Sequence, residues 1–171
     1  MVTRLSAFVG SLCLAGAAFA QVSPWSTPGS TCTPSDLTVR SENYRTGAAW
    51  VRHAPSKVGS VVLSCPIARY NFSRSGWTLN ITYQDSTGQG TTAFVRARLY
   101  RMSTGATTPA LLATATSDVS THTDPGMVAS PEFSHSFNFD NNMYWVRVEL
   151  YRSSTAETVT FYSASLRNPP L

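Results

Sequence analysis

Charge is scarce in this sequence, and its positive charge comes almost entirely from arginine. Charged residues make up 13% of the 171 residues, the formal net charge is +4, and Lys57 is the only lysine. The cations are scattered, with no basic run of the kind that binds nucleic acid or an anionic membrane surface. We therefore expect no nucleic-acid partner.

Catalytic motifs are also missing. The sequence has no GxSxG elbow, no HExxH zinc motif and no phosphate-binding P-loop. The three histidines, His53, His122 and His135, are isolated, except that His122 lies two residues before Asp124. Since a Ser–His–Asp triad is defined in space, a cluster of His122, Asp124 and a serine is the one hydrolase alternative left open. We predict a protein without catalysis and without a cofactor.

Only one long apolar run is present, and it lies at the N-terminus. The run from about Leu5 to Ala18 follows a single cation, Arg4, and leads into Ala18-Phe19-Ala20, the small-x-small pattern that signal peptidase cleaves. It is too short to span a bilayer comfortably, which takes roughly 20 residues. We predict a signal peptide over residues 1–20, a secreted or periplasmic protein of the cell envelope, and no membrane insertion after cleavage. A retained anchor or a lipoprotein is the alternative.

Cysteine is nearly absent from the rest of the chain. Only Cys32 and Cys65 remain after the predicted cleavage, and an even pair in an exported chain favours a disulfide. Closing a loop of this length stabilises a fold by about 3–4 kcal/mol on the loop-entropy estimate. A zinc site is disfavoured, because neither cysteine has a CxxC partner or a nearby histidine.

The remaining chain is rich in strand-forming residues. Residues 21–45 contain much Ser, Thr and Pro, which suits an extended N-terminal arm. Residues 46–171 contain about eight short alternating segments and no helical periodicity beyond two turns, which predicts one all-β domain, an antiparallel, jelly-roll-like β-sandwich. The predicted strands are Ala48–Ala54, Ser60–Ile67, Trp77–Gln84, Ala93–Met102, Leu111–Thr116, Glu132–Phe139, Tyr144–Arg152 and Thr158–Ser165.

Two of these segments repeat one another. AFVRARLYRMSTG, at residues 93–105, aligns without a gap with YWVRVELYRSSTA, at residues 144–156, at an offset of 51. Successive side chains of a strand point to opposite faces, so each copy gives an aliphatic row to the core and a second row, of an aromatic residue, two charged residues and a tyrosine, to the outside. Each copy is followed by a Ser-Thr-Gly or Ser-Thr-Ala turn and a further β-prone segment, PALLATATS or ETVTFYSAS, which predicts two similar hairpins. Outside these hairpins the match fades, and a full tandem repeat is not supported. The outer rows are Phe94, Arg96, Arg98 and Tyr100 in the first copy and Trp145, Arg147, Glu149 and Tyr151 in the second.

These eight outer residues form the predicted binding site. If the two strands lie close together, their rings and charged groups make a face suited to carbohydrate, because rings stack on sugars and polar groups hydrogen-bond the hydroxyls. A surface protein is the other partner considered, and burial of the same face in a subunit interface is an alternative. Internal packing would also explain the pattern, through cation–π contacts and a cross-strand pair of Arg98 with Glu149.

Two loops carry the oxygen ligands that calcium prefers. Asp140 and Asn141 lie in FDNN, and Asp118 and Asp124 lie in DVSTHTD. Turns favour Asn and Asp for backbone reasons as well, and neither loop has the dense spacing of a dedicated calcium site. Asp140 and Asn141 are therefore weak calcium candidates, and no metal site is predicted.

Four motifs follow one another between about Val58 and Leu166. They are GWTLNITYQDSTGQG, RARLYRMSTG, FNFDNNMYWVRVELYRSS and VTFYSASL. An aromatic strand that ends in a YxD turn precedes an arginine-rich strand, and a DN…Y turn leads into the penultimate strand. This pattern resembles a type of exported bacterial β-sandwich module of unknown function. The resemblance implies a small jelly-roll-like sandwich at or beyond the cell envelope, and it implies no catalytic residues.

Overall fold

The computed structural model describes residues 24–35, 40–70, 72 and 75–169. The predicted signal peptide lies outside the described residues. Within them the chain consists of strands, loops and three single-turn 3₁₀ helices, Gly29–Thr31, Ser41–Asn43 and Ser117–Val119. No helix in this part is long and apolar enough to cross a membrane.

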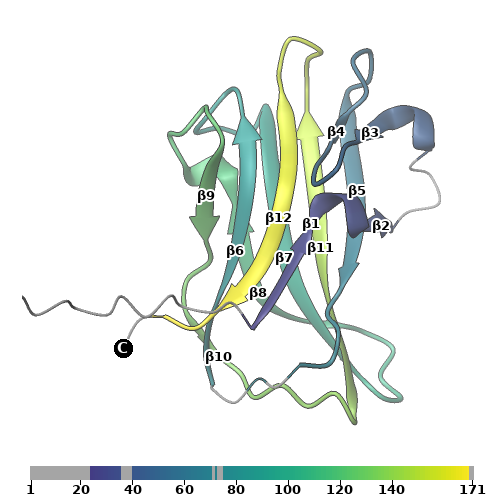
Figure 1. The fold of residues 1–171 in the computed structure, drawn as a ribbon, viewed down its shortest axis with the longest axis vertical. Coiled ribbons are helices and arrows are strands. Elements are labelled where there is room, and N and C mark those ends of the chain that lie inside the picture. Colours follow the sequence, from purple (N-terminus) through teal and green to yellow (C-terminus); the bar gives the residue numbers. More distant parts are fainter. Residues whose placement is uncertain (1–23, 36–39, 71, 73–74, 170–171) are drawn as a thin grey trace, which may run out of the picture.

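Two antiparallel sheets pack face to face (Figure 1). The front sheet, nearest the viewer in Figure 1, has the order β10-β6-β12-β4-β3, with β9 paired to β6 and β1 paired to β12. The rear sheet has the order β2-β5-β11-β7-β8. The front strands are β1 (Trp25–Pro28), β3 (Tyr44–Thr46), β4 (Val51–His53), β6 (Gly76–Asp85), β9 (Gly126–Ala129), β10 (Phe133–Ser134) and β12 (Val159–Arg167). The rear strands are β2 (Thr33–Pro34), β5 (Gly59–Pro66), β7 (Ala93–Ser103), β8 (Ala110–Thr116) and β11 (Asn142–Arg152).

The antiparallel β-sandwich predicted from the sequence is confirmed. Six of the predicted strands match β5, β6, β7, β8, β11 and β12 to within two residues at each end. The alternation assigned the inward rows of three strands, β6, β7 and β11, and these rows are buried. In β6 the inward row, Trp77, Leu79, Ile81 and Tyr83, is buried throughout.

The predicted strand Ala48–Ala54 is too long. Only Val51–His53 pairs, as β4, with β12 on one side and with β3 on the other. The backbone turns at Gly47, whose N–H donates to the carbonyl of Trp50 at 2.9 Å. Residues 48–50 therefore form the tip of a β3–β4 hairpin.

The predicted strand Glu132–Phe139 is mostly wrong. Only Phe133–Ser134 pairs, as β10, with the start of β6. Its alternation comes from aromatic rings that close one end of the sandwich: Phe137 and Phe139 lie 4.8 and 4.9 Å from the ring of Tyr144. A loop that places an aromatic ring on the core at every second position has the same sequence periodicity as a strand.

The N-terminal part of the described chain is extended and paired. Trp25 lies opposite Leu166 in the β1–β12 pair, and its side chain is buried. Thr33 and Pro34 pair with β5 as β2. Strands of two to four residues are too short to show a period, which is why β1, β2, β3 and β9 were not predicted.

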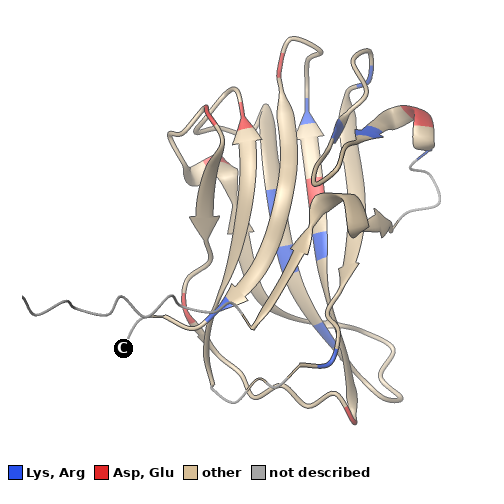
Figure 2. Cartoon of the chain, viewed as in Figure 1, with Lys and Arg blue, Asp and Glu red and all other residues tan. Residues whose placement is uncertain are grey.

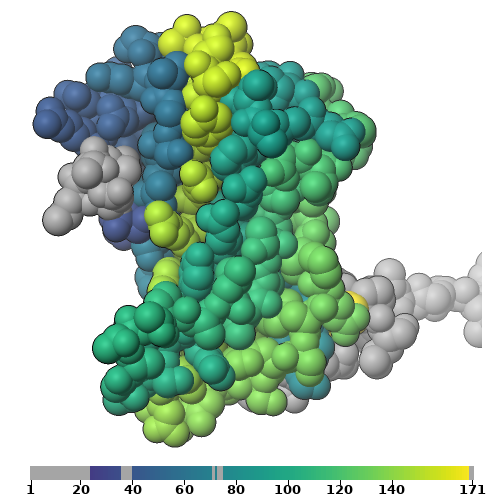
Figure 3. Space-filling view, turned by 180° about the vertical axis from the view of Figure 1, so that it is seen from behind, coloured from purple at the N-terminus to yellow at the C-terminus, as the bar shows by residue number. Residues whose placement is uncertain are grey.

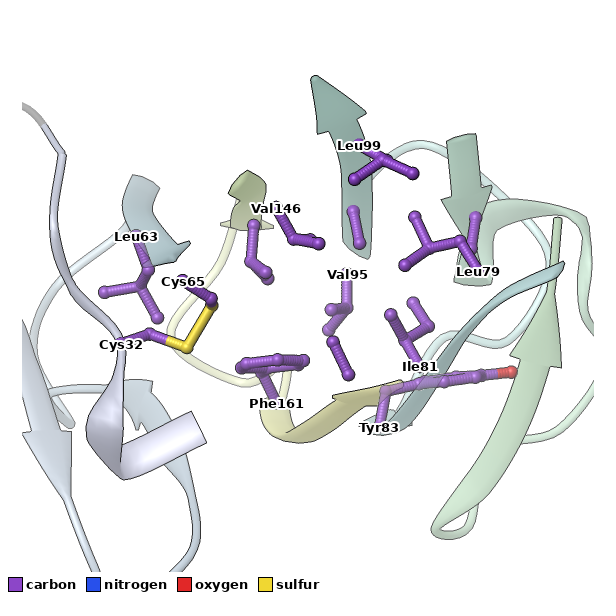
Figure 4. Packing of buried hydrophobic residues seen from close by; sticks show 14 of the residues in the cluster. Cys32, Leu63, Cys65, Leu79, Ile81, Tyr83, Val95, Leu99, Val146 and Phe161 are labelled. Carbon is purple, nitrogen blue, oxygen red and sulfur yellow. A yellow bond between two sulfur atoms is a disulfide. The ribbon is translucent and has the colours of Figure 1, made fainter. Parts of the chain in front are cut away.

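The core lies between the sheets and is apolar (Figure 4). Phe161 of β12 faces Val95 and Val146 of the rear sheet there. The predicted disulfide is present, with Cys32 and Cys65 joined at the edge of this cluster and their Cα atoms 4.5 Å apart. It fastens the N-terminal strands to β5.

A buried polar link joins the two sheets near one end of β6. Asp85 is fully buried, and one of its carboxylate oxygens accepts a hydrogen bond from the Ser117 hydroxyl at 2.7 Å. The Ser117 oxygen in turn accepts from the backbone N–H of Val95 at 2.9 Å. The other Asp85 oxygen accepts from the N–H and the hydroxyl of Thr87. Because buried polar groups need such partners, this link fixes the end of β6 against β7.

Candidate binding face

β7 and β11 are neighbours in the rear sheet, so the two repeated segments lie side by side. They run antiparallel, which places Phe94 opposite Tyr151 and Tyr100 opposite Trp145. The aromatic residues therefore stand at both ends of the outer face and the charged residues stand between them. In Figure 3 this face is seen from behind, with β7 in teal, β11 in yellow-green and β5 in blue.

One end of the face is closed by its own side chains. Phe94 is only 8% exposed and stacks on Tyr151, with ring centroids 5.2 Å apart. The Arg96 guanidinium carbon lies 4.3 Å from the centroid of the Phe94 ring, a cation–π contact. Arg96 also forms a 2.6 Å salt bridge with Asp118, which accepts a hydrogen bond from Thr116 as well. We call Phe94, Arg96, Asp118 and Tyr151 the closed half.

The middle of the face holds a diagonal ion pair. Arg98 contacts Glu149 at 3.6 Å, and Glu149 also accepts a 3.0 Å hydrogen bond from the Ser60 hydroxyl. The residue directly opposite Arg98 is not Glu149 but Arg147. Figure 2 shows the blue arginine bands of β7 and β11 close together, with a single red band on β11.

The other end of the face is open. Tyr100 and Trp145 stack with ring centroids 5.6 Å apart and planes 22° from parallel, so each ring covers one face of the other. Because the strand order is β5-β11-β7-β8, the second face of Trp145 is turned toward β5. In the part of the chain that the structure describes, the Trp145 indole N–H has no hydrogen-bond partner and Arg147, which is exposed, has no ion pair. We call Arg98, Tyr100, Trp145 and Arg147 the open half.

A low shelf borders the open half on the β5 side. Ser64 lies opposite Arg147, Pro66 lies opposite Trp145, and Thr33 of β2 lies opposite Ser64. These side chains are short beside an indole and a guanidinium, and all are at least partly exposed. The sequence analysis did not predict the shelf. The alternation of β5 could have indicated it, because Val61, Leu63 and Cys65 face the core and Ser64 and Pro66 therefore face outward.

The calcium candidates are engaged in other contacts. Asp140 forms an exposed 2.9 Å salt bridge with Arg69, and the N–H groups of Asp140 and Asn141 donate to the side-chain oxygen of Asn138. Asp118 belongs to the closed half. Over residues 24–35, 40–70, 72 and 75–169, no group of three or more His, Cys, Asp or Glu side chains has a metal-binding arrangement.

The hydrolase candidates lie in an exposed loop. Both His122 and Asp124 are exposed. Among the described residues no hydrogen bond joins the two side chains, and the contact made by His122 is between its backbone N–H and the Ser120 hydroxyl at 3.3 Å.

A second polar cluster, away from this face, surrounds Arg152. The guanidinium is 5% exposed and donates to the backbone carbonyls of Lys57, Glu157, Ala54 and Pro55, at 2.7 to 2.9 Å. Burial lowers the pKa of the guanidinium, and the nearby Glu157 carboxylate opposes this shift. These bonds tie the β4–β5 and β11–β12 loops together, so the role of Arg152 is structural.

Surface hollows in the described part of the chain lie away from this face. A hollow of about 250 Å³ lies beside Arg152 and is also lined by Arg52, His53 and Thr158. A groove of about 460 Å³ runs between β8 and the β9–β10 segment, past Leu112 and Phe133. Neither contains the outer residues of β7 and β11.

No known protein-family model matches the chain, and no curated protein sequence matches it. Among solved structures, the chain is similar to the Emp46p carbohydrate recognition domain in its potassium-bound form, with a TM-score of 0.44, 9% sequence identity, and coverage of 88% of this chain and 100% of that chain. The metal-free form of the same domain gives a TM-score of 0.39 and 9% identity over 85% of this chain and 99% of that chain. Likeness at this level carries no argument about a ligand, and the fold described above rests on the strand pairing itself.

Proposed function

We propose that this protein is an extracytoplasmic, non-catalytic binding module that holds a saccharide against the open half of the rear sheet. The observation that carries the proposal is the partly exposed Trp145 ring, which stacks on Tyr100 on one side and on the other side is turned toward the short side chains of the shelf, Ser64, Pro66 and Thr33. An aromatic face bordered by hydroxyl and guanidinium groups is the arrangement that sugars require, since one side of a sugar ring is apolar and its rim is polar.

The two halves of the face differ in whether their polar groups already have partners within the protein. In the closed half, Asp118 and the Phe94 ring already satisfy Arg96. In the open half, the indole N–H of Trp145 and the guanidinium of Arg147 have no such partners among the described residues. The predicted eight-residue site therefore narrows to Trp145, Tyr100, Arg147 and Arg98, with Ser64 and Thr33 added from the shelf.

The disulfide supports the proposed location outside the cytoplasm. A Cys32–Cys65 bond persists only where thiols are not kept reduced. This supports export, in agreement with the apolar N-terminal run of the sequence.

Replacement of Trp145 tests the saccharide proposal. We expect Trp145→Ala to lower affinity for a bound oligosaccharide by about tenfold or more, because stacking and aromatic burial contribute on the order of 1–2 kcal/mol. The melting temperature should stay nearly unchanged, since the ring belongs to the outer row of β11 and not to the core. Affinity would be measured by calorimetry with saccharides selected from a glycan array.

A matched control is available elsewhere on the surface. Tyr70 is 56% exposed and lies outside the face, so Tyr70→Ala should leave saccharide affinity unchanged. A large loss of stability in Trp145→Ala would show that the indole is packed instead, and the proposal would fail.

Burial of the open half against a second copy is the second candidate. The outer row continues past Trp145 to Met143, which is 58% exposed, and Leu111 beside Tyr100 is 54% exposed. Tryptophan, tyrosine, methionine and arginine are the residues enriched at protein interfaces. This composition is the specific observation in favour of an assembly module.

A further inference from the structure

The outer face has an approximate local two-fold symmetry. The repeat relates Ala97 to Val148, and these same residues lie opposite each other in the β7–β11 pair. A two-fold axis through this pair exchanges the two strands. It carries Phe94 onto Trp145 and Arg96 onto Arg147, so the closed half and the open half are equivalent positions.

The symmetry also relates the flanking strands. Arg96 lies opposite Thr116 of β8, and Arg147 lies opposite Ser64 of β5. Asp118, the salt-bridge partner of Arg96, comes two residues after Thr116. Counted along the chain, the corresponding position, two residues after Ser64, is Pro66, which is exposed and carries no charge; it is the last residue of β5, whereas Asp118 lies in the 3₁₀ helix that follows β8. The open half therefore lacks the carboxylate that the closed half contains.

Among the described residues, Glu149, the acidic residue of β11, does not supply this charge. Glu149 contacts Arg98 and accepts from Ser60, at 3.6 and 3.0 Å. Arg147 lies directly opposite Arg98, and like charges in that position destabilise a sheet. A local conflict of this kind is typical of a site whose missing partner comes from outside.

We propose, on the basis of the saccharide-binding function above, that the ligand is an acidic saccharide whose anionic group binds Arg147 over Pro66. Its carboxylate or sulfate lies beside Arg147 in the way that Asp118 lies beside Arg96. A sugar ring lies on the face of Trp145 that is turned toward β5. The planar guanidinium suits such a group, because it can donate two parallel hydrogen bonds to two oxygens. The Ser64 and Thr33 hydroxyls lie within the same shelf for the sugar hydroxyls.

Charge discrimination by the intact protein is the first test. Affinities would be measured for a panel of oligosaccharides of equal length: uronate-containing members without sulfate (oligogalacturonate), sulfated members without uronate (carrageenan-derived) and neutral members. We expect acidic members to bind up to about fivefold more tightly than neutral ones at low ionic strength, since an exposed ion pair contributes at most about 1 kcal/mol. The difference should shrink as salt is added, because salt screens exposed charges. The uronate and sulfate arms identify which anion is preferred.

Two substitutions locate the effect. Arg147→Gln should remove most of the preference for acidic members and leave neutral binding unchanged, with Arg147→Lys intermediate because it keeps the charge but loses the planar fork. Arg45→Gln is the matched control, since Arg45 is an exposed arginine on β3 of the front sheet.

Pro66→Asp tests the symmetry argument directly. It places a carboxylate at the position equivalent to Asp118, and we expect it to pair with Arg147 and to lower acidic binding as far as Arg147→Gln does. Pro66→Asn, which makes the same backbone change without a charge, should leave the acidic preference in place.

The outcomes separate this inference from the proposed function. Equal binding of acidic and neutral members, unaffected by Arg147→Gln, would overturn the acidic-ligand inference and leave saccharide binding standing. An unchanged acidic preference in Pro66→Asp would also overturn it. Absence of binding to every member of the panel would overturn both.

Discussion

Arg152 is a charged residue at the end of an aliphatic row, and its surroundings explain how it is tolerated. In β11 it shares the inward parity of Val146, Val148 and Leu150, and four backbone carbonyls surround its guanidinium. Buried charge is costly unless it is hydrogen-bonded. Beside it, His53 is buried and its Nε2 lies 2.9 Å from the carbonyl oxygen of Gly59.

His53 makes folding stability depend on pH. Burial lowers its pKa from 6.5 to about 4; the hydrogen bond to Gly59 opposes the shift, and the Arg152 charge adds to it. Between pH 6.5 and 4 the unfolded chain therefore takes up a proton that the folded protein does not. We expect the free energy of unfolding to fall by up to about 3 kcal/mol as pH decreases through this window, and this contribution to level off below pH 4. Burial, and then the Arg101 charge, also lower the pKa of His135, which acts in the same direction.

Denaturant unfolding from pH 7 to pH 4 measures this effect. His53→Gln, whose amide can still donate to Gly59, should flatten the pH dependence relative to the unmodified protein. His122→Gln, a change at an exposed histidine, should leave the slope as it was. Equal slopes in His53→Gln and the unmodified protein would show that His53 titrates normally in the fold.

At the scale of elements, the disulfide holds short strands that pair weakly on their own. β2 has only two residues, and its pairing with β5 continues in one further bond, from the Ser35 N–H to the Val62 carbonyl at 3.0 Å. Cys32 precedes β2 directly and Cys65 lies within β5. The covalent link therefore compensates for a ladder that is too short to persist alone.

Removal of the disulfide should be costly but local. We expect the double variant Cys32→Ser, Cys65→Ser to lose about 3–4 kcal/mol of unfolding free energy, because the loop that it closes spans 33 residues. Hydrogen exchange should speed up first at Ser35, while the β7–β11 amides stay protected. A loss below about 1 kcal/mol in urea unfolding, or a uniform loss of protection, would contradict this account.

The long strands were predictable because their side chains alternate between a buried and an open environment. The same parity also placed Arg152 inward, and it would have indicated the buried Asp85 had the predicted β6 been one residue longer. The alternation of Phe137 and Phe139 misled for the opposite reason, since the rings pack on Tyr144 without any strand pairing. Periodicity reports burial, and burial does not require a sheet.

At the scale of the whole molecule, solution state separates the two candidate functions. A saccharide-binding face must be open, so we expect a monomer by light scattering at micromolar concentration. Leu111→Asp and Met143→Asp should leave the mass unchanged, since both side chains are more than half exposed. A dimer that either substitution dissociates would replace the binding proposal with assembly through the open half.

The candidate face could be predicted only in part. The outer rows of both strands followed from parity, and the repeat suggested that they belong together. The sequence could not show that Asp118 closes one half, because that contact depends on where the β8–β9 connection passes. It also could not show that Pro66 lies beside Trp145, since strand order is a property of the whole sandwich.

The position of Lys57 has a practical consequence for binding measurements. It lies in the β4–β5 loop, two residues before β5 begins, whereas Pro66 and the open half lie where β5 ends. The intervening strand spans roughly 20 Å. Apart from the α-amino group, Lys57 is the only amine of the chain. Coupling through the Lys57 amine to a sensor surface or a bead therefore attaches the protein by the end of β5 away from the open half, and the face of Trp145 and Arg147 points into solution.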